Sequence, residues 1–148
     1  MTGQGAYLFG GRWNSPGRHA VYLSGTLTLA MLEVLVHIDD TEAFLEKSHI
    51  YHSVNFGEAD VSVLEAASLP QGWNARPETR ASQQVGDEFL ERAEHLVLAL
   101  PSVITPSGLR YDPLYMNYLL NPKHPEVSGV ELGRIKELDW DVRLAEAL

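Results

Sequence analysis

The chain contains no cysteine. Disulfide bonds and metal sites with thiolate ligands are therefore excluded, as is typical of proteins from a reducing cytoplasm. The first five residues show neither the basic start nor the apolar core of a signal peptide. Acidic residues at positions 33, 39 and 40 also interrupt the longest apolar run, so no span of about 20 apolar residues remains for a membrane helix. We expect a cytoplasmic protein that does not enter a membrane.

Basic residues are scarce, because 11 lysines and arginines oppose 20 acids and leave a net charge of −9. Neutralising a phosphate backbone requires clustered cations, so this balance argues against independent binding of DNA or RNA. It is compatible with a basic protein partner. The first 38 residues differ, since they carry two arginines and a single glutamate. A locally basic, glycine-rich segment in an acidic chain indicates a site for a small anionic ligand.

A length of 148 residues fits one domain, 1–148, that can bury roughly two thirds of its unfolded surface. Short strands mixed with few helices predict an α+β fold with short mixed or antiparallel strands and no nucleotide-binding crossover. The strands are expected at 19–24, 49–56, 61–64 and 95–100, with one or two more between 130 and 140. The other expected elements are helices at 26–38 and 82–92, a loop at 69–77 and a helical turn at 117–122. The first helix is apolar on nearly all sides, which predicts that it is buried.

Glu33 lies alone in that apolar helix, with no lysine or arginine in the same run. Burying an ionised carboxylate without a partner costs several kcal/mol, so the chain must compensate this charge or use it. Taken by itself, an ion pair with Arg12 or Arg18, or a side chain that reaches the surface, explains Glu33 as well as catalysis does.

Other residues also have ordinary structural explanations when each is taken singly. Trp13 and Tyr22 are typical of packed cores, and Ser102 and Asn117 are typical of strand ends and turns.

A metal site is not expected. His49 and His52 have a spacing that suits a metal only on a helix, and on the expected strand they point to opposite faces.

Five segments, taken in order, resemble the RES domain family. They are residues 10–14 (GGRWN), 21–24 (VYLS), 32–37 (LEVLVH), 100–102 (LPS) and 117–122 (NYLLNP). The family is named for an arginine, a glutamate and a serine, which fall here on Arg12, Glu33 and Ser102. The resemblance implies a fold similar to ADP-ribosyltransferases. It also implies the toxin of a bacterial RES-Xre toxin–antitoxin pair, which degrades NAD by hydrolysis or phosphorolysis.

The same resemblance implies catalytic roles for Glu33, Arg12 and Tyr22. Glu33 would favour the oxocarbenium-like state that forms when the nicotinamide–ribose bond of NAD breaks. Arg12 would bind the pyrophosphate or hold Glu33 ionised, and Tyr22 would stack on nicotinamide or ribose. The implied substrate-binding residues are Arg12, Trp13, Asn14, Tyr22, Ser24, Ser102 and Asn117. No cofactor is implied beyond NAD as the substrate.

Two alternatives to NAD degradation stay open at this point: an ADP-ribosyltransferase that modifies a cellular protein, and an inactive NAD-binding module. The family usually has an additional strand before residue 5, so we expect either a missing edge strand or a start assigned too late. The segment between Ser102 and Asn117 is longer than the family pattern and is interpreted as a loop beside the pocket.

A protein partner is expected by the same resemblance. An antitoxin with an Xre-type helix-turn-helix domain would cover the NAD pocket and would make the contacts with DNA. A homodimer of the toxin within such a complex is compatible with the resemblance.

Overall fold

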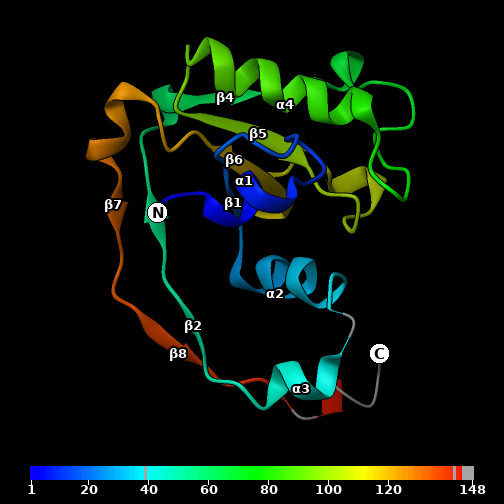
Figure 1. Ribbon diagram of the computed structural model, residues 1–148, viewed down its shortest axis with the longest axis vertical. Helices are drawn as coiled ribbons and strands as arrows, with labels where there is room; N and C mark the ends of the chain where they lie inside the picture. Colours follow the sequence, from blue (N-terminus) through cyan, green and yellow to red (C-terminus); the bar gives the residue numbers. More distant parts are fainter. Residues whose placement is uncertain (39, 142, 145–148) are drawn as a thin grey trace.

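The computed structural model describes residues 1–38, 40–141 and 143–144. Its centre is a four-stranded sheet with the order β1 (Val21–Ser24), β6 (Met116–Leu120), β5 (Val97–Pro101) and β4 (Val61–Val63) (Figure 1). β6 is antiparallel to both β1 and β5, whereas β4 is parallel to β5. β5 is buried at every position, as its unbroken apolar sequence predicts. The strands expected within 19–24, 61–64 and 95–100 are confirmed.

Helix α4 (Arg80–Arg92) covers one face of this sheet (Figure 1). It begins after Thr79, whose hydroxyl accepts a hydrogen bond from the Ser82 backbone N–H at 3.2 Å. Its apolar side chains pack on a core that comprises Trp13, Ala20, Trp73, Leu98, Leu100 and Leu119. The expected helix at 82–92 is confirmed, and its capping residue places the start two residues earlier.

A short helix, α1 (Gln4–Phe9), was not predicted from the sequence. Ala6 packs against the same core as α4, and its carbonyl accepts a hydrogen bond from Asn14 Nδ2 at 3.0 Å. The expected loop at 69–77 is confirmed, and it carries the buried Trp73 into this core.

Residues 117–122 were expected to form a helical turn, and this prediction is wrong. Asn117, Tyr118, Leu119 and Leu120 belong to β6, which pairs with a neighbour on each side. A run of three apolar residues between two asparagines is too short for its periodicity to separate a strand from a helix. Pairing with two strands that are distant in sequence decided the outcome.

Helix α2 (Leu27–Leu35) begins after Thr26, whose hydroxyl accepts from the Leu29 N–H at 3.2 Å. The expected burial on nearly all sides is found on one side only. Leu29 and Leu35 are buried, whereas Leu32 and Val34 are 42% and 43% exposed. An apolar sequence shows that a helix can be buried, but the number of segments packed around the helix decides how much of its surface is buried.

Two narrow ribbons extend from the sheet (Figure 1). β2 (His49–Tyr51) pairs with β8 (Lys136–Leu138), and β3 (Val54–Asn55) pairs with β7 (Glu131–Leu132). The strand expected at 49–56 is therefore split in two, because each half has a different partner. The expectation of strands between 130 and 140 is confirmed. A short helix, α3 (Thr41–Leu45), lies near the end of the β2–β8 ribbon that is farther from the sheet (Figure 1).

Single turns of 3₁₀ helix connect several of these elements. They are η1 (Glu58–Asp60), η2 (Ala66–Ser68), η3 (Ser107–Leu109), η4 (Pro113–Tyr115) and η5 (Pro125–Gly129). No described helix reaches the length and hydrophobicity that crossing a membrane requires.

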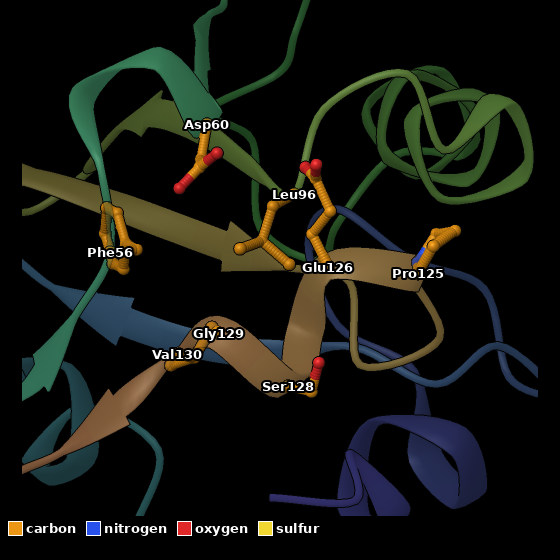
Figure 2. A pocket seen from close by; sticks show the side chains of 8 residues that line it. All are labelled: Phe56, Asp60, Leu96, Pro125, Glu126, Ser128, Gly129 and Val130. Carbon is orange, nitrogen blue, oxygen red and sulfur yellow. The ribbon is translucent and has the colours of Figure 1, made fainter.

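The second face of the sheet carries its own core and the larger hollows of the molecule. Leu96, Val97 and Leu120 form the buried part of this core. A cavity of about 1030 Å³ lies between this face and residues 51–56. A smaller pocket, of about 360 Å³, is lined by Leu96 and by residues of the turn from Pro125 to Val130, among others (Figure 2).

Candidate active site

Glu33 lies in the last turns of α2, and its carboxylate meets the ends of β5 and β6. Ser102 Oγ donates to Glu33 Oε1 at 2.7 Å, and Asn117 Nδ2 donates to the same oxygen at 2.5 Å. Within the described residues, no lysine or arginine lies within ion-pair distance of this carboxylate. The proposed ion pair of Glu33 with Arg12 or Arg18 is therefore wrong, and two neutral donors hold the charge instead.

Both donors bind the same oxygen, which gives the carboxylate a defined orientation. Glu33 Oε2 accepts no hydrogen bond from the described part of the chain. One oxygen is therefore held by the protein while the other is available to a ligand.

Ser102 directly follows the buried strand β5 and is only 1% exposed. Its Oγ accepts a hydrogen bond from the Ile104 backbone N–H at 3.1 Å while it donates to Glu33. Because a peptide N–H can only donate, the serine must direct its own proton to the carboxylate. The position of Ser102 after a strand end was predicted from the sequence, and the structure adds the partner.

Asn117 is oriented by a residue on the neighbouring strand. Ser24 and Asn117 are paired in the β1–β6 register, and Ser24 Oγ donates to Asn117 Oδ1 at 2.8 Å. This bond turns the carbonyl oxygen of the amide toward Ser24 and its NH₂ group toward Glu33. Ser24, expected to bind substrate, is in this structure a residue that orients Asn117.

Replacing Ser24 by alanine should release the Asn117 amide. Loss of one hydrogen bond of about 1 kcal/mol should speed exchange of the Asn117 side-chain amide protons with water by about 3- to 10-fold. Ser24→Thr retains the hydroxyl and should keep the slow exchange. Side-chain amide signals in nuclear magnetic resonance spectra measure both variants. Equal exchange in the alanine and threonine variants would show that Ser24 does not orient the amide.

Tyr22 is paired with Leu119 in the β1–β6 register and holds its hydroxyl inside the protein. The hydroxyl donates to Asn14 Oδ1 at 2.8 Å and accepts from the Trp13 backbone N–H at 3.0 Å. Burial raises the pKa of Tyr22 well above its ordinary value, and the hydrogen bond from the Trp13 backbone opposes that shift. The residue remains 40% exposed as a whole, which leaves ring surface free for stacking.

Trp13 and Asn14 are enclosed, so the implied direct contact with substrate is corrected to a structural role. Asn14 is fully buried, and its Nδ2 donates to the carbonyl oxygens of Ala6, Ser15 and Arg18. Trp13 is 2% exposed and lies in the core. Both residues hold the glycine-rich turn in place, and sequence alone could not separate this role from ligand binding.

Arg12 contacts the loop at 73–78. Its Nη1 donates to the carbonyl oxygens of Trp73 at 2.7 Å and Ala75 at 3.0 Å, and its Nη2 lies 3.9 Å from Glu78 Oε1. The expectation that Arg12 holds Glu33 ionised is therefore wrong. Binding of pyrophosphate by Arg12 stays a prediction.

The large cavity is lined by Tyr22 and Ser24, whereas Glu33, Ser102 and Arg12 are not among its lining residues. The pocket in Figure 2 contains none of the candidate residues either. The oriented carboxylate of Glu33 therefore lies outside both of these hollows.

Comparisons with known proteins identify the family of this chain. Residues 1–141 match the family model of the RES domain. This chain belongs to the RES domain family. The protein named toxin Res of Photorhabdus laumondii is 34% identical over 148 residues, which cover 99% of this chain and 88% of that relative. The Prs ADP-ribosylating toxin of a Sphingobium species is 31% identical over 145 residues, with 97% and 86% covered.

Among solved structures, the crystal structure of the Mycobacterium tuberculosis MbcT–MbcA toxin–antitoxin complex contains a similar chain. The TM-score is 0.72 at 20% identity, and the match covers 93% of this RES domain and 76% of that chain. At this identity the likeness shows the fold alone. The predicted family and the α+β fold class are both confirmed.

Proposed function

We propose that this RES domain is the toxin of a toxin–antitoxin pair and cleaves the nicotinamide–ribose bond of NAD. The observation that carries the proposal is the orientation of Glu33. Ser102 and Asn117 hold Oε1, while Oε2 accepts nothing from the described residues. A carboxylate that is oriented in advance and not neutralised by a cation is suited to stabilise positive charge that develops on a substrate.

In the proposed reaction, Glu33 Oε2 accepts a hydrogen bond from a hydroxyl of the nicotinamide ribose. The bond between the ribose C1′ and the nicotinamide nitrogen then breaks, and nicotinamide leaves with the bonding electrons. The negative carboxylate favours the oxocarbenium-like ribose that results. Water or phosphate attacks C1′ and loses a proton to solvent. The exposed ring surface of Tyr22 stacks on nicotinamide or ribose.

A second candidate function is transfer of ADP-ribose to a protein. It is favoured by the name of the Sphingobium relative, a Prs ADP-ribosylating toxin. Both reactions need the same bond cleavage and the same oriented carboxylate, and they differ in the acceptor that attacks C1′. NAD is the substrate in both, and no other cofactor is proposed.

An antitoxin partner is part of the proposal. The similar fold in a toxin–antitoxin complex supports such a partner for this chain. We expect an Xre-type antitoxin to cover the NAD site and to make the DNA contacts, because the net charge of −9 disfavours binding of a nucleic-acid backbone by the toxin.

The purified chain, incubated with NAD, should release nicotinamide in buffer alone. The same incubation with NAD labelled in its adenylate phosphate should leave the label in free ADP-ribose or its phosphorylated form. Chromatography of small molecules and gel analysis of protein-bound label measure the two products. If the label appears on a lysate protein, and nicotinamide is released only when lysate is present, the activity is transfer of ADP-ribose to a protein and not NAD degradation. Binding of NAD without any nicotinamide release would reject both activities and leave an NAD-binding module.

A further inference from the structure

Arg12 is occupied by the loop at 73–78, so its Nη1 group already serves two carbonyl oxygens. The pyrophosphate of NAD carries two negative charges and needs cationic donors close to the nicotinamide ribose. A second arginine near Glu33, with a guanidinium that is held in place but keeps free donors, would supply this charge.

Arg110 meets both conditions. Its guanidinium carbon lies 5.3 Å from the centre of the Trp73 ring, and its Nε donates to the Thr105 carbonyl oxygen at 3.3 Å. The Trp73 ring also stacks on Trp13, with ring centres 5.9 Å apart and an interplanar angle of 24°. Within the described residues, neither Nη nitrogen of Arg110 makes a hydrogen bond or an ion pair. The guanidinium of Arg110 is thus held by stacking on Trp73 and by the hydrogen bond from Nε, and its two Nη groups are free to donate.

Arg110 is also tied to the segment that holds Glu33. That segment begins at Ser102, which binds Glu33, and ends at Thr105, which accepts from Arg110. Thr105 is 4% exposed, and its hydroxyl donates to the Tyr115 carbonyl oxygen at 2.9 Å, so the segment is held firmly at this end. Three residues span at most about 10 Å. The pyrophosphate of NAD is joined to the nicotinamide ribose by one methylene and one ester oxygen, which requires a similarly short separation.

We propose that Arg110 binds the pyrophosphate of the dinucleotide, and that Arg12 positions the loop under Trp73. This inference rests on the proposed function. Arg110 donates from its two free Nη groups to phosphate oxygens, while the ribose lies against Glu33. Arg12 acts by donating a hydrogen bond to the backbone carbonyl oxygen of Trp73. The assignment makes Arg110 a substrate-binding residue in the segment between Ser102 and Asn117.

The test measures binding and turnover separately. ADP-ribose, which contains the pyrophosphate but no nicotinamide, should bind Arg110→Gln about 10- to 100-fold more weakly than the wild-type chain in calorimetric titrations, because a hydrogen-bonded charge is lost. The KM for NAD should rise by a similar factor with kcat nearly unchanged, since the pyrophosphate is bound equally in ground and transition states. Arg110→Lys keeps the charge but loses the planar guanidinium, so its affinity for ADP-ribose should lie between those of the wild-type chain and Arg110→Gln.

Arg134→Gln is the matched control, because it removes the same charge from the exposed turn between β7 and β8. It should bind ADP-ribose like the wild-type chain. The inference would be overturned if a folded Arg110→Gln chain bound ADP-ribose with unchanged affinity. It would also be overturned if Arg134→Gln lost as much affinity as Arg110→Gln, even if NAD is cleaved. Arg110-dependent binding without nicotinamide release would support the subsite and reject the proposed cleavage. Absence of ADP-ribose binding by the wild-type chain would reject the subsite.

Discussion

Replacing Glu33 by glutamine should lower nicotinamide release by about 100- to 1,000-fold, the loss typical for removal of one preorganised electrostatic group. Glutamine has nearly the same shape and keeps an oxygen that can accept from Ser102. The negative charge that favours the oxocarbenium-like ribose is lost, so turnover should fall far more than binding. Nicotinamide release over time, at saturating NAD, measures the effect on kcat.

The control for this substitution is Glu88→Gln on the exposed side of α4. The Glu88 side chain is 67% exposed and lies 3.9 Å from Arg92, so its neutralisation removes the same charge far from the oriented carboxylate. It should leave release unchanged. Circular dichroism and urea unfolding must show that Glu33→Gln remains folded. A folded Glu33→Gln chain with full turnover would show that the carboxylate does not take part in bond cleavage.

Replacing Gly86 by alanine should destabilise the protein by about 3 kcal/mol or more, although the same change within a helix ordinarily stabilises it by about 1 kcal/mol. Gly86 lies in the middle of α4 where the helix meets the glycine-rich turn. A Cβ atom at this position would overlap the Trp13 carbonyl oxygen and would lie 2.7 Å from its carbonyl carbon. Both atoms are backbone, so α4 or the turn must move.

Gly5→Ala is the matched control for this prediction. Gly5 also lies in a helix, α1, but its added Cβ would have no neighbour within 4 Å. Its free energy of unfolding in urea should be unchanged or higher by up to about 1 kcal/mol. The displaced turn in Gly86→Ala carries the Trp13 N–H that binds the Tyr22 hydroxyl, so the candidate site should be disturbed as well. Equal stability of Gly86→Ala and wild type would contradict the close contact between α4 and Trp13.

Local sequence information was sufficient for several elements and for part of the site. The unbroken apolar run at 96–100 predicts a buried central strand, and Pro101 and Ser102 mark its end. Glu33 is identified because an unpaired acid in an apolar run is unusual. The same reasoning failed at 117–122 and in the degree of burial of α2, because both depend on which distant segments pack beside them.

The roles of the candidate residues depended still more on distant contacts. Ser24 and Asn117 are 93 positions apart, and only the β1–β6 register brings their side chains into a hydrogen bond. Arg12 is near Glu33 in sequence but binds the loop at 73–78, which lies over 60 residues away. Arg110 has no signal of its own in the sequence, since its importance comes from the ring of Trp73 beneath it.

The amino-acid sequence by itself determined the family, the α+β class, the central buried strand and the lone carboxylate. These properties follow from residue types and from patterns within short windows, where each residue's preference acts locally. Only the tertiary structure decided which donors hold Glu33, which oxygen they leave free, and which arginine has free donors. Hydrogen bonds and ion pairs act over about 3 to 4 Å, so they are decided by which segments meet in space rather than by separation along the chain.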